Sequence, residues 1–296
     1  MMDSGACEPS GGMQTWHPPE TSHPETPHRI PSAAGFSWQQ RCIDLLERRY
    51  LRWKESRRQA GAGSGYSSDT ARAATLLPRL LRPLFPEIVW RIEPDRRASA
   101  SDDPSDRGCA LTFDDGPCPG RTEPLLDLLA EYEIPGTFFL VGQAAQAHPQ
   151  LVRRIVSAGH QIGNHTWSHR DAWSCPFPLV AEELARTRDQ LEQMTGQAVP
   201  LIRPPHGHFT AKYRRYCVES QSRLVMWDTL PGDFVPGLSA GWMASFAARW
   251  LRPGSILVWH DSLSADRTVA ALRYLLPPLI DQGWQFRRVR DPFQEG

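Results

Sequence analysis

From residue 107 onward, short runs of strand type alternate with longer runs of helical type. Helical patterns such as TEPLLDLLAEYEI and LVAEELARTRDQLEQMTG separate the strand-type runs, and several patterns close on the glycine that commonly follows a helix. The strand-type runs, seven in number, lie near residues 109–114, 137–142, 160–165, 201–204, 223–229, 255–260 and 284–289. Repeated strand–helix units require parallel strands, and seven in succession suit a barrel better than an open sheet. We therefore predict an α/β fold, a distorted (β/α)7-type barrel.

The N-terminal part of the chain lacks this alternation. Residues 1–34 are rich in Pro, Ser, Gly, His and Thr and poor in aliphatic residues, a composition that predicts a disordered tail. In residues 36–59, apolar side chains recur at helical spacing opposite a face of arginines, which predicts an amphipathic helix. We expect that helix to dock on the main domain, and the alternative is that it lies on a membrane surface.

A Gly/Ser linker, AGAGSGYSS, follows the predicted helix. Residues 76–93 are apolar but carry Pro78, Pro83 and Pro86, so we do not expect one continuous helix there. We expect this stretch to pack under the barrel and to enter it as a short strand. The predicted organisation is a disordered tail (1–34), an amphipathic helix with its linker (35–75) and a catalytic domain (76–296).

Charge and composition exclude several classes of protein. The chain has 33 basic and 33 acidic residues, so no general attraction draws it to nucleic acid or to an anionic membrane. Its six cysteines form no CxxC pair, and we expect reduced thiols. No apolar run reaches the ~18 residues that a membrane span needs. The N-terminus lacks the features of a signal peptide, so the sequence reads as cytoplasmic; a cell-envelope location is the alternative if the assigned start is not the biological one.

Polar side chains occur where the predicted strands end. In parallel α/β barrels the carboxyl ends of the strands share one face, and chemistry collects there. The residues at these positions, from the first to the sixth predicted strand, are Asp114, Asp115, His165, His169, Arg203, Asp233 and His260. We therefore expect these side chains to meet in one site.

The two histidines suggest a metal site. His165 and His169 are four positions apart, so both imidazoles can lie on one side of a single turn. One carboxylate from the first strand would complete a set of two histidines and one acid, which leaves positions open for water and substrate, as catalytic zinc sites do. The cation would also keep the neighbouring aspartate ionised as a base. The same set of ligands suits non-haem iron(II) oxygenases, so the residue types alone leave both chemistries open.

Five short motifs make the pattern more specific. TFDDGP, HTWSH, RPPHG, WDTLPGDF and LVWHD, in this order, resemble the five motifs of the polysaccharide deacetylase family, carbohydrate esterase family 4, whose members include chitooligosaccharide and peptidoglycan deacetylases. The likeness spans residues 108 to about 290. It implies a metal-dependent hydrolase that removes acetyl groups, in the first place N-acetyl groups, from an amino-sugar glycan or oligosaccharide.

The resemblance also implies roles for individual residues. Carried across by motif, the ligands of a divalent metal are Asp115, His165 and His169. Zn²⁺ is the expected ion, with Co²⁺, Ni²⁺ or Mn²⁺ as substitutes. Asp114 would be the general base toward a metal-bound water, and Arg203 would position Asp114. His260 would be the general acid toward the leaving amine, with its basicity tuned by Asp233.

Substrate-binding residues are expected in the same motifs. His206 stands where the family usually has tyrosine, and Phe234 where it often has tryptophan. The Pro205–Gly207 turn could offer backbone N–H groups to the oxyanion. Trp167, beside the histidine motif, could stack on a sugar ring. The expected substrate-binding residues are therefore Pro205, His206, Gly207, Phe234 and Trp167.

Three alternatives to deacetylation stay open. An amidase acting on small amides or cyclic imides could use the same barrel and metal ligands. An iron(II) oxygenase would leave Asp114, Arg203, Asp233 and His260 without a task. A non-catalytic glycan-binding module would have no need for this full complement of acid and base residues.

Overall fold

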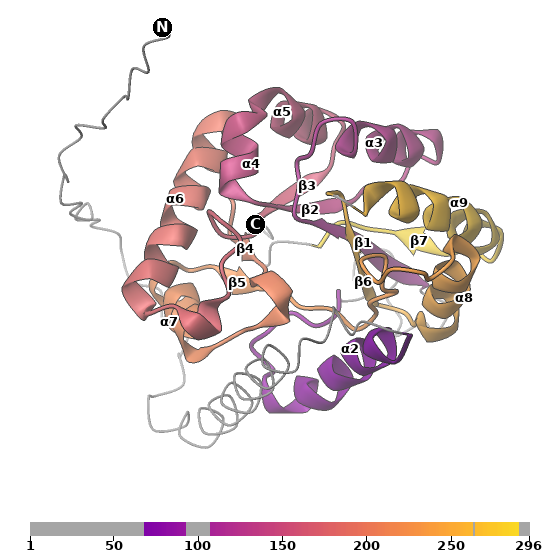
Figure 1. The fold of residues 1–296 in the computed structure, drawn as a ribbon, viewed down its shortest axis with the longest axis horizontal. Coiled ribbons are helices and arrows are strands. Elements are labelled where there is room, and N and C mark those ends of the chain that lie inside the picture. Colours follow the sequence, from indigo (N-terminus) through magenta and orange to yellow (C-terminus); the bar gives the residue numbers. More distant parts are fainter. Residues whose placement is uncertain (1–67, 93–106, 263, 290–296) are drawn as a thin grey trace, which may run out of the picture. The chain divides into compact units, whose positions relative to one another are not determined.

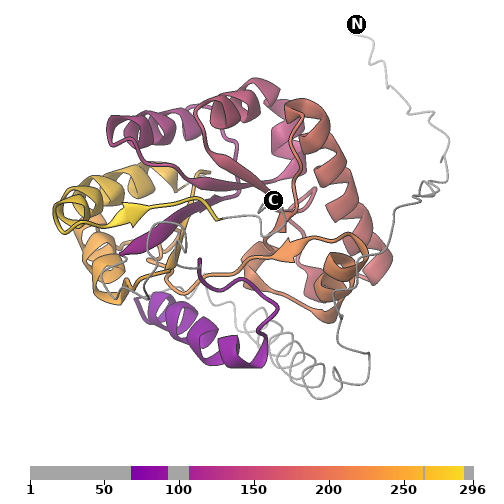
Figure 2. The ribbon, with the colours of Figure 1, turned by 180° about the vertical axis from the view of Figure 1, so that it is seen from behind.

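Seven parallel strands form the centre of this computed structural model, which describes residues 68–92, 107–262 and 264–289. All of these residues fall in one compact unit, Trp38–Gly296. Helices surround the curled sheet on its outer side (Figure 1), and the view from behind shows the same ring of helices (Figure 2). The predicted α/β barrel is confirmed.

Each predicted strand is present, although several are shorter than expected. The strands are β1 (Gly108–Asp114), β2 (Thr137–Leu140), β3 (Gln161–Asn164), β4 (Leu201–Ile202), β5 (Arg223–Leu224), β6 (Ile256–His260) and β7 (Gln285–Phe286). β1 is buried along its whole length and lies between β2 and β6. A strand buried on both faces reads as a continuous apolar run, which is why the sequence CALTF marks β1 clearly.

The strand order places the chemistry-bearing strand ends together. The sheet runs β5-β4-β3-β2-β1-β6, and β7 pairs with the amino-terminal end of β1. β1 and β6 are in register from Ala110 and Ile256 to Asp114 and His260. Asp114 and His260 therefore lie at the same height on neighbouring strands.

The sheet is distorted between its first and last strands, β5 and β6. Isolated bridges join Val89 to Val225, Arg91 to Ser255, and Thr229 to Leu257 across this region. Residues 88–92 therefore enter the barrel as extended chain, which agrees with the short strand that we predicted within residues 76–93.

The helices of the barrel cover the outer face of the sheet. They are α3 (Thr122–Glu131), α4 (Gly142–Ala147), α5 (Pro149–Ser157), α6 (Phe177–Thr195), α7 (Ala211–Glu219), α8 (Ala240–Trp250) and α9 (Ala265–Asp281). Short 3-10 turns lie at Arg82–Leu84, Ala172–Ser174 and Pro205–Gly207. Gly196 directly follows α6 and has a φ of 67°, the left-handed conformation for which a glycine is expected after a helix.

One helix contradicts the predicted boundaries. α2 (Ser68–Leu81) begins inside the stretch assigned to the linker and continues through Pro78. Proline has no N–H to donate to the carbonyl of Ala74, four residues earlier. Trp227 Nε1 donates to that carbonyl instead, at 3.0 Å. Thr75 is fully buried and accepts a hydrogen bond from the Leu230 N–H at 3.1 Å, so α2 belongs to the barrel domain.

The remaining N-terminal predictions, the tail at 1–34 and the amphipathic helix at 36–59, lie outside the described residues. Among the described helices, none combines the length and apolar character needed to cross a bilayer. Cys109, Cys118, Cys175 and Cys217 are unpaired thiols in the described part of the chain, as expected.

Candidate metal and acid–base site

Three predicted metal ligands converge at the carboxyl ends of β1 and β3. Asp115 directly follows β1, and His165 directly follows β3. The Nε2 atoms of His165 and His169 lie 3.4 and 3.1 Å from the same carboxylate oxygen, Asp115 Oδ1. One donor atom from each residue lies within 4.8 Å of the others.

The backbone bends sharply to bring these side chains together. Asp115, Thr166 and His169 have φ values of 79°, 67° and 56°. This left-handed conformation costs a residue with a Cβ about 1–2 kcal/mol, so the surrounding contacts must stabilise it. One such contact is the hydrogen bond of 2.9 Å that Asn164 Oδ1 accepts from the Thr166 N–H.

The donor atoms fit a shared cation. His165 Nδ1 lies 2.8 Å from the carbonyl oxygen of Arg203, which can only accept, so Nδ1 carries the proton and Nε2 presents its lone pair to Asp115. An imidazole lone pair that faces a carboxylate needs a cation between them. Ligand atoms about 2.0–2.1 Å from one tetrahedral zinc ion lie about 3.4 Å apart. The two distances from Asp115 Oδ1 to the imidazoles, 3.4 and 3.1 Å, are close to that separation.

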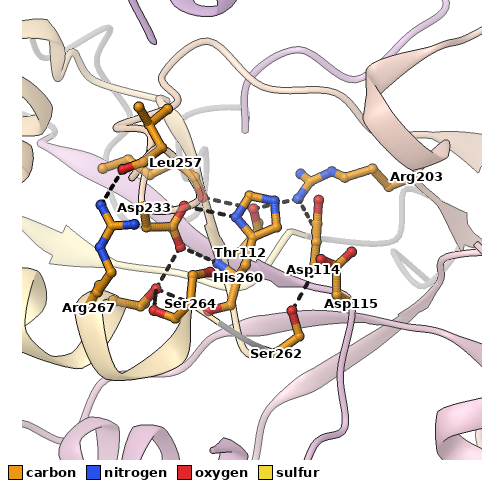
Figure 3. A network of polar contacts seen from close by, with 12 residues as sticks. Thr112, Asp114, Asp115, Arg203, Asp233, Leu257, His260, Ser262, Ser264 and Arg267 are labelled. Atoms are coloured by element: carbon orange, nitrogen blue, oxygen red, sulfur yellow. Dashed lines mark hydrogen bonds and ion pairs between the residues drawn. The ribbon is translucent and has the colours of Figure 1, made fainter. Parts of the chain in front are cut away.

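Beside these ligands, Asp114 is fixed by a buried arginine. Arg203 is fully buried, and its Nη1 donates to Asp114 Oδ1 at 2.8 Å and to Thr112 Oγ1 at 2.7 Å. Its Nε and Nη2 donate to the carbonyls of Val225 and Met226 at 3.3 and 3.1 Å. Figure 3 shows the Arg203 guanidinium beside Asp114 and joined to it by a dashed line. The arginine is held on all sides, so it orients the carboxylate rigidly.

His260 forms a second pair of charged groups with Asp233. The Nδ1 of His260 lies 2.8 Å from Asp233 Oδ1, and its backbone N–H donates to Oδ2 at 2.7 Å. Thr268 Oγ1 donates to the same Oδ2 at 2.6 Å. Burial lowers the pKa of His260, but Asp233, together with Asp115 and Asp114, outweighs it and raises that pKa to about 10. The imidazole is therefore cationic at neutral pH, and its contact with Asp233 uses Nδ1 and not Nε2.

Several supporting residues were missed by sequence reasoning. Ser262 Oγ donates to Asp115 Oδ2 at 3.3 Å (Figure 3). Asp261, the residue after His260, is fully buried and accepts a hydrogen bond from Thr122 Oγ1 at 2.9 Å. Burial, with the charges of Asp115 and Asp114, outweighs this hydrogen bond and raises the pKa of Asp261 to about 7. These contacts join residues far apart in the sequence and leave no local pattern; for Asp261 the signal was its position directly after His260.

The expected substrate-binding turn lies beside the metal ligands. Pro205 is buried, whereas His206 is exposed and has a φ of 59°. The ring of His206 meets that of His169 edge to face, with centroids 4.7 Å apart. Gly207, with a φ of 69°, leaves no room for a Cβ because the Trp227 ring lies against it. Trp227 therefore packs against the turn at Gly207, and His206 lies next to the predicted metal ligand His169.

The two predicted aromatic contacts have different positions. The ring of Phe234 lies edge to face against His260, 5.4 Å between centroids, so it borders the site. Trp167 is 7% exposed and packs against Gly142, and the Arg186 guanidinium covers its ring at 3.7 Å. The expectation that Trp167 stacks on a sugar ring is therefore not supported, because its faces are occupied by protein. Trp173, in the 3-10 turn Ala172–Ser174, stacks on the ring of His208, with centroids 3.8 Å apart.

A parallel α/β barrel that gathers two histidines and a carboxylate at its strand ends, beside a fixed carboxylate and a cationic imidazole, has the parts of a metal-dependent hydrolase. A sequence profile described as polysaccharide deacetylase matches residues 101–224. The chain is 36% identical over 190 residues to a chitooligosaccharide deacetylase of Sinorhizobium fredii, covering 60% of this chain and 87% of that protein. The chain belongs to the polysaccharide deacetylase family.

Two further comparisons agree with this assignment. A peptidoglycan-N-acetylglucosamine deacetylase of Bacillus cereus is 32% identical over 187 residues, covering 62% of this chain and 68% of that protein. The crystal structure of a peptidoglycan N-acetylglucosamine deacetylase has a TM-score of 0.62 at 28% identity, covering 69% of this chain and 91% of that one.

Proposed function

We propose that this enzyme hydrolyses N-acetyl groups of an amino-sugar glycan or oligosaccharide that contains N-acetylglucosamine. Its similarity to chitooligosaccharide and peptidoglycan-N-acetylglucosamine deacetylases supports this substrate class. One observation carries the mechanism: the cluster of Asp115, His165 and His169 adjoins Asp114, which Arg203 binds, and Asp114 is in register with His260, which Asp233 binds. Amide hydrolysis needs a base for the attacking water and an acid for the leaving amine, and this arrangement offers both.

We propose Zn²⁺ as the ion held by Asp115, His165 and His169, with Co²⁺, Ni²⁺ and Mn²⁺ as substitutes. When bound, a divalent ion supplies a Lewis acid for the acetyl carbonyl and makes water a stronger nucleophile at neutral pH. His165 is prepared for this role by its bond from Nδ1 to the Arg203 carbonyl, which leaves Nε2 free as the ligand atom.

Side chains of the protein carry out the two proton transfers of the reaction. Asp114, oriented by Arg203, accepts the proton of the attacking water. His260 donates its Nε2 proton to the amide nitrogen as the carbon–nitrogen bond breaks, and Asp233 stabilises the imidazolium before that transfer. The products are acetate and the free amino sugar.

A backbone N–H of the Pro205–Gly207 turn completes the proposed site. Proline has no N–H, and those of Gly207 and His208 donate to the carbonyls of Pro204 and Pro205, each at 3.1 Å. We therefore assign the N–H of His206 as the donor toward the developing oxyanion, a role that does not depend on its side chain.

Acetate release from defined substrates tests this function. The zinc-loaded protein should release acetate from chitooligosaccharides or peptidoglycan fragments and should leave small non-sugar amides and cyclic imides intact. The Asp114→Asn variant, prepared with the same zinc content, is the control for contaminating activity. The proposal fails if zinc-loaded wild-type protein releases no more acetate from any of these glycans than this variant does.

A further inference from the structure

A buried glutamate with no part in the chemistry lies behind the histidine loop. Glu183, on α6, is 8% exposed. Its Oε2 accepts from the Ser168 N–H at 2.7 Å, and its Oε1 accepts from Ser168 Oγ at 2.7 Å. Ser168 directly precedes His169 in the chain. A carboxylate therefore holds, by two short hydrogen bonds, the residue that precedes a proposed metal ligand.

His169 depends on such support more than His165 does. The N–H of His165 donates to the carbonyl of Leu140 at 2.9 Å, and its Nδ1 contacts the carbonyl of Arg203 at 2.8 Å. His169 lies further along the loop in a left-handed conformation, and its side chain is 30% exposed. Its position is therefore set largely by the preceding residue, which Glu183 fixes.

α6 contacts this loop at three residues, Asn164, Trp167 and Ser168. Asn164 Nδ2, at the start of the loop, donates to the carbonyl of Leu184 at 2.8 Å. Arg186 covers the ring of Trp167 at 3.7 Å. Glu183 makes the third contact, at Ser168. Thr187 Oγ1 in turn donates to the backbone carbonyl of Glu183 at 2.8 Å. A helix of 19 residues thus acts as a rigid support for the metal-ligand loop.

We propose that Glu183 is a positioning residue that sets the affinity of the site for its divalent metal ion, although it contacts neither the metal ligands nor the substrate. The carboxylate stabilises the left-handed turn before His169 and so prepares the second imidazole for binding. The inference rests on the metal site of the proposed function. Outer residues that orient metal ligands typically change metal affinity by about 10–100-fold when they are replaced.

The test measures metal affinity and not activity alone. Zinc is titrated into metal-free full-length protein against a chromophoric chelator, and the absorption spectrum of the Co²⁺-loaded protein reports ligand geometry. Glu183→Ala removes both acceptors, so we expect about 100-fold weaker zinc binding and an altered Co²⁺ spectrum. Glu183→Gln keeps one oxygen for the Ser168 N–H, and its amide can donate to Ser168 Oγ, so we expect partial rescue, about 10-fold weaker binding.

A second glutamate on the same helix provides the matched control. Glu192 lies near the carboxyl-terminal end of α6, and its Oε1 accepts from the Val199 N–H at 2.9 Å. Glu192→Gln therefore also perturbs a carboxylate that holds backbone, but it should leave zinc affinity and the Co²⁺ spectrum as in the wild type. If Glu183→Ala fails to fold, Glu183→Gln and Ser168→Ala carry the test, because Ser168→Ala keeps the backbone N–H and removes the hydroxyl.

The outcomes separate this inference from the proposed function. Wild-type zinc affinity in the Glu183 variants, or an equal loss in Glu192→Gln, would overturn the positioning role. A wild-type protein that binds no zinc would overturn both proposals. Weakened binding in the Glu183 variants of a protein that binds zinc but releases no acetate would support the inference and refute the deacetylase assignment.

Discussion

Gly116 should tolerate no side chain, because a buried carboxylate occupies the place of its Cβ. A Cβ built at Gly116 would lie closer than 3.0 Å to the carboxylate of Asp261. Asp261 cannot easily move away, since it is fully buried, its N–H donates to the Asp114 carbonyl at 3.1 Å, and Thr122 Oγ1 donates to its Oδ2 at 2.9 Å. We therefore predict that Gly116→Ala destabilises the fold.

The magnitude follows from two costs. Overpacking a buried site costs about 1–3 kcal/mol. Displacing Asp261 from Thr122 breaks a hydrogen bond to a buried carboxyl group, which adds about 1–3 kcal/mol. The two costs are not fully additive, because displacing Asp261 relieves part of the steric clash. We therefore expect Gly116→Ala to lower the free energy of unfolding by about 2–4 kcal/mol. Urea denaturation monitored by circular dichroism measures this difference.

Two matched variants make the result decisive. Gly241 lies in α8, and a Cβ there meets nothing within 4 Å, so Gly241→Ala should be neutral or stabilise the helix by up to ~1 kcal/mol. Removing the obstructing carboxylate with Asp261→Ala should restore part of the stability lost in Gly116→Ala. A free energy of unfolding for Gly116→Ala within about 0.5 kcal/mol of the wild type would refute this prediction. So would a double variant, Gly116→Ala with Asp261→Ala, that recovers none of the lost stability.

Further predictions concern proton transfer. Asp114→Asn should lower kcat about 10²–10⁴-fold with zinc content unchanged, and a variant with near-normal kcat would remove Asp114 as the base. The pKa of His260 is about 10 in the folded protein, above its ordinary value of about 6.5. Protonation of His260 therefore stabilises the fold fully below about pH 6.5, and this stabilisation is lost as the pH rises through about 10. A bound cation repels the imidazolium and lowers the pKa of His260. The alkaline limb of the plot of kcat against pH should therefore have its midpoint below pH 10. Asp233→Asn should move that limb down by about 2 pH units, equivalent to about 2.7 kcal/mol; an unchanged limb would contradict the role of Asp233.

The barrel was predictable because its periodicity is local. β1 and β6 read as apolar runs that end in Asp114 and His260, and parallel strands place such ends on one face. The same rule predicted that Asp115 and the two histidines meet.

What the sequence could not show depends on contacts between distant residues. Pro78 suggested a helix break, but the indole of Trp227 satisfies the carbonyl that the proline leaves free. Trp167 looked available because its neighbours are metal ligands, yet Arg186 covers its ring. Glu183 had the ordinary appearance of a polar residue on an amphipathic helix, and its role at Ser168 becomes visible only in three dimensions.

The most direct test of the account is calorimetric titration of Zn²⁺ into metal-free protein and into three single histidine variants. The wild type should bind one ion per chain, and His165→Ala and His169→Ala should each lose tight binding. His206→Ala is the control, because its ring touches that of His169 without belonging to the cluster of donors, and it should bind like the wild type. Equal zinc binding in His165→Ala and the wild type would contradict the account.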